Sequence, residues 1–463
     1  MKTKKHSINP YVLVILSFVA VILLGTGLLC LPFSHTNGQW GNFIDEIFTA
    51  TSATCVTGLC TYSTGIGNEL TFFGQLVVLM MIQIGGLGFV TVLTFIVTLF
   101  KSKLQFKNRY LLSQMVGSTN FADVVKFVRK LILISFSCEA IGFIIGLPVF
   151  FHVYPHEPLK ALWSSLFISV SAFNNAGFDI FGATSLVTGV GNPFMDALGN
   201  GWAYYYLCTL IMVLIVMGGI SFLVILELFT FKKPNQWRVF TKIVLSTTGV
   251  LLLGGTLVLF VSEGLINHNM NFFECLFQSV TCRTAGFATY NQDNLSVGGK
   301  VFSCLLMFIG GSPLSTAGGI KTTTIFMIVL AMFSYFKGRH VVAFKREYGT
   351  NMIVKAMSLV FTSLFFLIIS FVAISSFERN TVFAINTDKA TATTFELFSA
   401  MGTVGLSTGI TPSLSLGSKI VICLLMLLGR LGPMTFLQLF QINMNKNDEN
   451  IHYQYVEEDF LIG

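Results

Sequence analysis

The chain has 463 residues, of which 53% are hydrophobic and 11% are charged, and its formal net charge is +7. So few charges leave too little polar surface for a soluble protein of this length, which excludes a water-soluble enzyme and favours an integral membrane protein. The basic residues are dispersed over short connections, where membrane topology accounts for them, so the positive charge does not indicate nucleic-acid binding.

Eight apolar stretches are long enough, at about 20 residues each, to cross a hydrocarbon core of roughly 30 Å. We expect spans near residues 11–31, 72–100, 131–151, 203–231, 240–261, 300–336, 352–377 and 416–440. Four other apolar stretches are too short to cross and are expected as half-crossing helices near 43–53, 161–173, 271–282 and 393–401. The sequence therefore predicts an all-α integral membrane protein with about eight transmembrane helices.

Each half-crossing helix is followed by the same pattern, in which small residues end in a glycine and a bulky apolar residue follows. The glycines are Gly58, Gly177, Gly286 and Gly405, which lie 119, 109 and 119 residues apart by subtraction of their numbers. This repetition predicts four equivalent units of span, short helix, glycine segment and span around a central pore. The units are approximately 8–127, 128–236, 237–347 and 348–445, in one membrane domain of residues 1–463 with a cytoplasmic tail at 446–463.

The glycine segments are candidates for a cation filter. Non-helical backbone is tolerated at membrane depth only where it is buried in protein or lines a wet cavity. Backbone carbonyls can replace the water shell of a monovalent cation, and glycine permits the required backbone and a close approach to the axis. The alternative is a tight turn without a ligand, which a single copy would favour but four copies in register do not. The predicted filter residues are Thr57, Gly58, Ala176, Gly177, Ala285, Gly286, Val404 and Gly405.

The positive charges predict the orientation. They cluster in alternate connections, at Lys2 to Lys5, 101–130, 232–242 and 337–346, and by the positive-inside rule these connections and both termini face the cytoplasm. The intervening connections then open outward, where acidic residues would gather cations. Ordinary solvated loop charges are the alternative for these acids, which are Asp45, Glu46, Glu69, Glu157, Asp179, Glu263 and Glu274.

The sixth apolar stretch contains a string of helix breakers between Phe308 and Thr322, which predicts an unwound segment in mid-membrane. Such a segment is either a gate beneath the filter or a packing kink between helices. Arg430 lies within the last apolar stretch, where a charge is costly, and is expected to form a barrier with this segment, with snorkelling as the alternative. Lys321 either snorkels or joins the barrier. The predicted gate residues are Gly310, Gly311, Ser312, Thr316, Ala317, Gly318, Gly319, Lys321 and Arg430.

These motifs resemble the membrane subunits of the bacterial Ktr potassium uptake systems, of the KtrB or KtrD type, within the Trk, Ktr and HKT superfamily. The resemblance implies a potassium site at the four glycines, one per unit, and an intramembrane loop that blocks the cavity beneath them. It also implies a bacterial cell membrane, a homodimer with one pore per protomer, a cytosolic ring of nucleotide-binding regulatory subunits of the KtrA or KtrC type, and promotion by sodium. Leu314 departs from the family, which more often has a small residue there.

Other functions find less support in the sequence. No His-Glu-x-x-His motif is present, which argues against catalysis by a membrane metalloprotease. A receptor or scaffold would leave the four matched glycines unexplained. We therefore expect a protein that is not an enzyme, uses no organic cofactor and passes potassium inward, with sodium as a second candidate ion.

Overall fold

The computed structural model describes residues 10–88, 121–182, 185–187, 201–230, 233–383 and 387–433, together with residues 194, 198, 199 and 385. The expected amino-terminal basic cluster, the connection at 101–120 and the tail at 446–463 lie outside the described residues. The same holds for the expected spans beyond residues 88 and 433.

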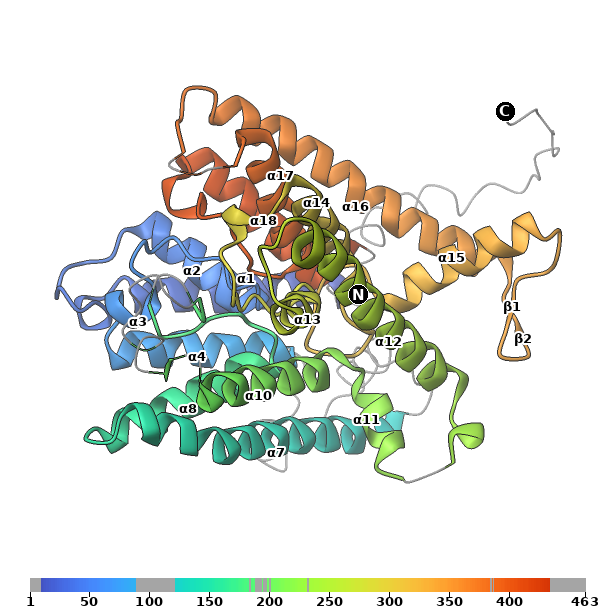
Figure 1. Ribbon diagram of the computed structural model, residues 1–463, viewed down its shortest axis with the longest axis horizontal. Coiled ribbons are helices and arrows are strands. Elements are labelled where there is room, and N and C mark those ends of the chain that lie inside the picture. Colours follow the sequence, from blue (N-terminus) through green and yellow to red (C-terminus); the bar gives the residue numbers. More distant parts are fainter. Residues whose placement is uncertain are drawn as a thin grey trace, which may run out of the picture.

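Helices make up most of the described chain. They are α1 (Pro10–Leu29), α2 (Phe43–Cys55), α3 (Ile66–Glu69), α4 (Phe72–Leu87), α7 (Phe121–Val153), α8 (Pro158–Phe173), α10 (Trp202–Gly219), α11 (Phe222–Leu228), α12 (Val239–Leu259), α13 (Phe272–Thr281), α14 (Val297–Phe308), α15 (Thr322–Phe336), α16 (Thr350–Phe377), α17 (Lys389–Gly402) and α18 (Leu416–Leu431). A π-helical turn, Phe260–Ile266, continues α12. Strands β1 (Val342–Ala343) and β2 (Arg346–Glu347) form an antiparallel hairpin between α15 and α16, at the right-hand end of Figure 1.

Four described helices are long and apolar enough to cross a membrane, namely Val128–Val153, Trp202–Gly219, Val239–Ile266 and Thr350–Phe377. Shorter apolar helices of 10 to 17 residues accompany them, among them Val14–Leu29, Phe72–Leu87, Val297–Phe308 and Thr322–Phe336. The predicted helical membrane architecture is therefore confirmed. The number of spans stays a prediction.

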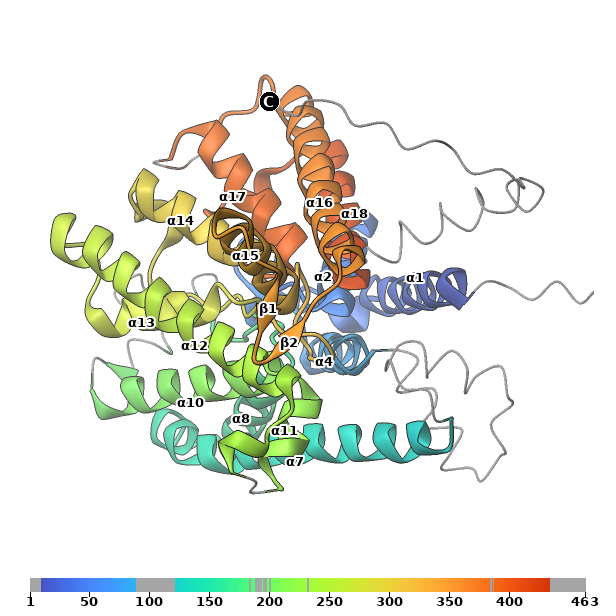
Figure 2. The same cartoon turned by 90° about the vertical axis from the view of Figure 1, so that its right-hand side faces the viewer.

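The helices form four successive groups around a common centre, which Figure 2 shows as a change of colour from blue through green and yellow to red. Within each group a long helix packs against a short one: α1 with α2, α7 with α8, α12 with α13 and α16 with α17. Between groups, the apolar helix that comes after the glycine segment packs against the short helix of the next group: α4 with α8, α10 with α13, α14 with α17 and α18 with α2. The last of these contacts joins the end of the described chain to its beginning, so the four groups close into a ring.

The chain turns in the same way after each short helix. The residue two places before each repeated glycine has a left-handed backbone, which turns the chain into the glycine segment: Val56 (φ 57°), Asn175 (φ 59°), Thr284 (φ 69°) and Thr403 (φ 50°). The carboxyl end of each short helix therefore directly precedes a glycine segment. Because a helix carries a partial negative charge at this end, the arrangement favours a cation near the segments.

Candidate functional site

The four glycine segments (residues 56–59, 175–178, 284–287 and 403–406) meet in a closed ring, with each repeated glycine against the backbone of the next segment. A Cβ atom placed on Gly58 would lie 2.5 Å from the carbonyl oxygen of Ala176. One on Gly177 would lie 2.6 Å from Ala285 O, and those on Gly286 and Gly405 would lie closer still to Val404 O and Thr57 O. The structure thus brings all eight predicted filter residues together, and the fourth segment returns to the first.

Only glycine meets both demands of this ring. The four φ angles are 99°, 70°, 80° and 95° for Gly58, Gly177, Gly286 and Gly405, in the region that L side chains rarely adopt. The neighbouring segment also leaves no room for a β-carbon.

Hydrogen bonds to the preceding short helices hold the glycine segments in place. The N–H groups of Thr57, Ala176 and Val404 each donate at 2.8 Å to the carbonyl of a serine in the preceding helix, and Ala285 N donates at 3.0 Å to Thr281 O. Those serines are Ser52, Ser171 and Ser399. The side chains of Ser52 and Ser399 accept from Gly58 N at 3.1 Å and from Gly405 N at 3.0 Å.

The carbonyl oxygens of the repeated glycines, and of the residue before each of them, are free of such bonds. In the described part of the chain, no N–H or O–H group donates to the carbonyl oxygens of the four glycines or of the four residues before them. Extended backbone with unpaired carbonyls is the arrangement that replaces the water shell of a bare alkali cation. The ring therefore offers oxygen ligands to a cation at its centre.

A cavity of about 640 Å³ opens onto the ring and is lined by all four repeated glycines. Asp179 and Asp293 also line this outer cavity, as do Tyr62 and Tyr290. Burial raises the pKa of Asp179 to about 6, against hydrogen bonds from Ser185 and from the N–H of Phe181, which lower it. A cavity with two carboxyl groups next to the ring attracts cations from the adjoining solvent.

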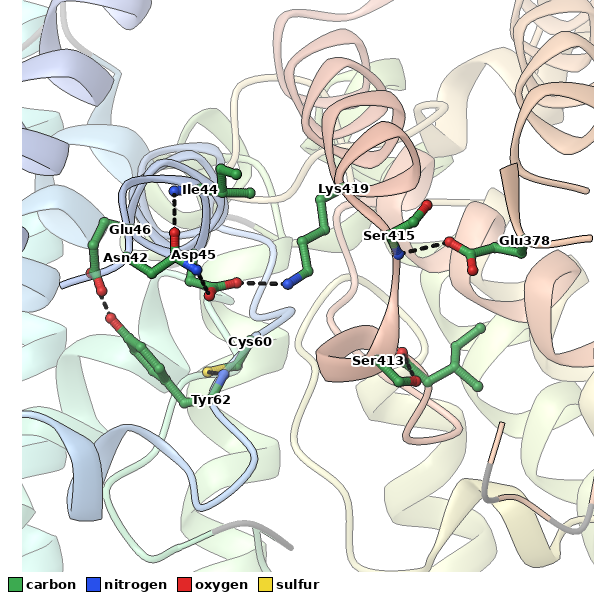
Figure 3. Close-up of polar contacts among 11 residues, drawn as sticks. Asn42, Ile44, Asp45, Glu46, Cys60, Tyr62, Glu378, Ser413, Ser415 and Lys419 are labelled. Atoms are coloured by element: carbon green, nitrogen blue, oxygen red, sulfur yellow. Dashed lines mark hydrogen bonds and ion pairs between the residues drawn. The ribbon is translucent and has the colours of Figure 1, made fainter. Parts of the chain in front are cut away.

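The acids expected to open outward have different places in the structure. Asp179 lines the outer cavity, as expected, whereas Asp45 pairs with Lys419 at 2.7 Å and thereby joins α2 to α18 (Figure 3). Glu46 is buried and accepts a 2.5 Å hydrogen bond from the Tyr62 hydroxyl. Asp293, which the sequence reasoning did not single out, lines the cavity as well. Its position after the third glycine segment was the signal for it.

The sixth apolar stretch is interrupted where the helix breakers are, because α14 ends at Phe308 and α15 begins at Thr322. We call residues 309–321 the crossing loop. On one side it is bound to the end of α10, where Ser312 N donates to Gly219 O at 3.1 Å and Thr316 N donates to Gly218 O at 3.2 Å.

On the other side the crossing loop contacts the fourth group of helices. Gly319 N donates to Gly429 O at 3.2 Å, and a Cβ atom on Gly318 would lie 3.0 Å from Thr403 Cγ2. Thr316 Oγ1 donates to Phe173 O, at the end of α8, at 3.2 Å. The loop therefore spans from the second group to the fourth, and it contacts the end of the short helix before the second glycine segment and the first residue of the fourth segment.

Arg430 lies in the last turn of α18 and connects the crossing loop to the first group of helices. Its guanidinium donates to the carbonyl oxygens of Thr316 and Gly85, and at 3.0 Å to that of Gly86. Gly85 and Gly86 end α4, where helix carbonyls carry partial negative charge. Lys321 instead donates to its own loop, at 2.7 Å to Ala317 O. The predicted gate residues are thus brought together with Arg430 directly bonded to the loop.

Three further glycines shape this region and were missed. Gly85, Gly218 and Gly429 pack so tightly that an added Cβ atom would lie 2.8 to 2.9 Å from the carbonyl carbons of Thr54, Phe173 and Met401 respectively. Each of those carbonyls is four residues before a repeated glycine. The signal was the glycine pair in the inner helices, at 85–86 and 218–219, with Arg430 in the second place of the pair at 429–430.

Comparison with known proteins agrees with this geometry. Residues 1–453 match the model of the TrkH family, described as "Cation transport protein". The chain is 33% identical over 469 residues to the "Potassium/sodium uptake protein NtpJ" of Enterococcus hirae, covering 100% of this chain and 99% of that protein. It is 35% identical over 453 residues to the "Ktr system potassium uptake protein B" of Bacillus subtilis, covering 96% of this chain and 95% of that protein.

Among solved structures, the potassium transporter TrkH from Vibrio parahaemolyticus has the same fold, with a TM-score of 0.68 at 17% sequence identity over 95% of this chain and 86% of that chain. The matched relatives are ion transporters and not enzymes. The chain belongs to the TrkH family of cation transport proteins, and it is a membrane transporter of the kind that its glycine motifs resemble.

Proposed function

We propose that this protein takes up potassium through a channel-like pore that passes through the ring of Gly58, Gly177, Gly286 and Gly405. The observation that carries the proposal is the closed ring of segments in which the carbonyl oxygens of the four glycines, and of the residue before each, accept no hydrogen bond from the described residues. Relatives with full coverage are named for potassium uptake, one of them for potassium and sodium.

A potassium ion enters from the outer cavity, where Asp179 and Asp293 favour its approach. At the ring it exchanges water for carbonyl oxygens of the glycines and of Thr57, Ala176, Ala285 and Val404. The negative ends of the four short helices stabilise it there. One glycine per segment gives a shorter stack of carbonyls than a long filter, so sodium is a second candidate for permeation or coupling.

The four groups of helices are, in this proposal, four copies of one unit, bounded near 8–127, 128–236, 237–347 and 348–445. About eight helices then span a bacterial cell membrane, and both termini, including the tail at 446–463, face the cytoplasm. The helix after each glycine segment packs against the short helix of the next unit. This supports the symmetry, because the same contact recurs at all four junctions.

The crossing loop and Arg430 form the gate of the proposed pore. The loop reaches from the second group to the fourth beneath the ends of two short helices, and Arg430 ties it to the end of α4. A positive charge at this place repels a cation that leaves the ring. We assign opening to a cytosolic ring of nucleotide-binding subunits on a homodimer of this chain, with promotion by sodium. The name "Ktr system" of several relatives supports further subunits.

Uptake by a potassium-auxotrophic cell tests this function. Cells that express the chain with a regulatory subunit are expected to grow at low potassium and to accumulate rubidium, and cells that express the chain alone to do so more slowly. Purified protein in liposomes separates the classes of function, because vesicles that stay impermeable to potassium, rubidium and sodium with the regulatory subunit present contradict transport.

A further inference from the structure

Glu139 is a buried carboxyl group that the proposed pore and gate do not use. It lies midway along the membrane-spanning part of α7, Val128–Val153, and is 4% exposed. The four described helices that are long enough to cross a membrane contain one other acid, Glu263, which lies in the π-helical turn at the end of its helix. A carboxylate in mid-membrane is costly and is retained where it has partners and a function.

The partners of Glu139 are all hydrogen-bond donors. Gln83 Nε2 donates to Oε1 at 2.9 Å and to Oε2 at 3.2 Å, Asn174 Nδ2 donates to Oε1 at 3.0 Å, and Ser135 Oγ donates to Oε1 at 3.2 Å. A carboxyl group that only accepts is suited to the ionised form. No lysine or arginine in the described ranges forms an ion pair with it.

Asn174 connects this carboxylate to the second glycine segment. It is the C-cap residue that directly follows α8, three positions before Gly177, and the next residue, Asn175, makes the left-handed turn into the segment. Besides Glu139, the Asn174 amide also donates to Gln83 Oε1 at 3.0 Å. The position of Asn174 is thus set by two side chains that contact each other.

Gln83 connects the carboxylate to the gate. It lies in the last turns of α4, two and three positions before Gly85 and Gly86, whose carbonyls accept from Arg430. The end of α4 also packs directly on Asn174, because a Cβ atom on Gly86 would lie 2.7 Å from Asn174 Cγ. Hence one hydrogen-bonded cluster contacts both the helix end that holds Arg430 and the residue that begins the second glycine segment.

We propose that Glu139 is a positioning residue for ion preference: its carboxylate fixes Asn174 and Gln83 against each other, and so holds the second glycine segment in register with the end of α4 that binds Arg430. The inference rests on the proposed potassium pore and names a determinant of its selectivity outside the ring. The group acts through Asn174 and is not a ligand of the ion.

The substitution Glu139→Gln tests the role of the carboxylate. The amide oxygen of the new side chain can still accept from Asn174, but without the negative charge, and its NH2 group takes the place of Oε2, where it faces the NH2 group of Gln83. The charge-assisted bond that holds Asn174 is lost, and we expect Asn174 to shift. Loss of a charge-assisted hydrogen bond of this kind corresponds to a change of about tenfold. We expect the preference for potassium over sodium, measured by competition for rubidium uptake into liposomes, to fall about tenfold. Glu347→Gln, at an exposed glutamate of the hairpin between α15 and α16, is the matched control and keeps the wild-type preference.

The double variant Glu139→Gln with Gln83→Glu is the rescue. Asn174 Nδ2 is within hydrogen-bond distance of both positions, so exchanging the two side chains returns a carboxylate acceptor to it. The ion preference of the exchanged protein is expected to return close to that of the wild type. A general packing defect would not be repaired by moving the carboxylate.

Wild-type preference in Glu139→Gln overturns the proposal, and so does failure of the exchange to restore it in a protein whose thermal unfolding is unchanged. If Glu139→Gln does not fold, Asn174→Ser decides the question, because it removes the amide that binds Glu139 and Gln83. Loss of potassium preference in Asn174→Ser supports the proposal, and normal preference overturns it. Wild-type vesicles without any cation flux would instead contradict the proposed pore, so the two failures are distinguishable.

Discussion

Gly405 is the most crowded glycine of the ring, and its crowding can be separated from its backbone conformation. Its φ is 95°, and a Cβ atom would lie 2.9 Å from Gly58 Cα. We expect Gly405→Ser to displace the first glycine segment and to lower the preference for potassium over sodium by about tenfold or more, since each 1.4 kcal/mol of lost discrimination is tenfold. Ion competition for rubidium uptake measures this preference.

Gly409 supplies the control for that experiment. Its φ is also 95°, but no atom lies within 4 Å of an added Cβ. Gly409→Ser therefore introduces the same backbone strain, about 1–3 kcal/mol, without the contact in the ring. Equal loss of ion preference in both variants would show that strain and not the ring determines selectivity.

Glu46 gives the protein a pH dependence that can be measured. Burial raises its pKa to about 7 from the ordinary 4.5, against the Tyr62 hydrogen bond, which lowers it. A carboxyl group with a raised pKa binds a proton more often in the folded protein, so the free energy of unfolding falls as pH rises from about 4.5 to about 7. Glu46→Gln removes this contribution to the pH dependence of the free energy of unfolding. The melting temperature is expected to fall less between about pH 4.5 and 7 in the variant than in the wild type. Equal slopes of melting temperature against pH in the two proteins would contradict the assignment to Glu46.

At this scale the repeated glycines could be predicted from the sequence, because a requirement for glycine is visible wherever the same pattern recurs. The partners of Glu139 could not. Gln83 and Asn174 are separated from it by 56 and 35 residues, and no periodicity connects a polar residue of one helix to polar residues of two others. Glu46 was expected as a mouth acid, but its burial depends on a tyrosine that packs back from the following loop.

Among the elements, the position of the crossing loop was the feature best predicted from the sequence. Its contacts with other helices were the feature least well predicted. Glycine, proline and serine between Phe308 and Thr322 cannot continue a helix, and α14 and α15 end and begin there. The loop is held by α10 on one side and by α18 on the other, which follows from the ring and not from the local sequence. Leu314, expected to affect the loop, has a left-handed φ of 55° and accepts from Phe222 N at 2.9 Å.

Arg430 is expected to control leakage through the loop. Arg430→Ala removes the hydrogen bonds to Thr316, Gly85 and Gly86 together with the positive charge. Each charge-assisted bond contributes about 1.5–3 kcal/mol, so we expect rubidium flux through the chain alone, without a regulatory subunit, to rise about tenfold or more.

Arg430→Lys is the matched variant, because it keeps the charge and loses the forked guanidinium that bonds to both the crossing loop and α4. Its rubidium flux is expected to lie between that of the wild type and that of Arg430→Ala. Unchanged flux in Arg430→Ala would remove the barrier role, and equal flux in both variants would assign the barrier to the hydrogen bonds and not to the charge.

For the whole molecule, the sequence predicted four units but not how they meet. The closure of the ring depends on contacts between the ends of the chain, such as the pair of Asp45 and Lys419, which are 374 residues apart. Positions so distant share no local signal. Four-fold repetition indicates that closure occurs, and the packing of α18 against α2 shows which surfaces carry it.

The pair of Asp45 and Lys419 at this junction is expected to stabilise the closed ring. Their side chains are 23% and 12% exposed, and the bond is 2.7 Å long (Figure 3). Partial burial reduces screening by solvent, so a double-mutant cycle with Asp45→Asn and Lys419→Met is expected to give a coupling free energy of about 1 kcal/mol. The exposed pair of Glu157 and Lys160, at 59% and 55% exposure, is the control and is expected to give about zero. Unfolding of the detergent-solubilised protein measures both cycles. Equal coupling in the two pairs would show that the junction of the first and last helices is held by packing alone.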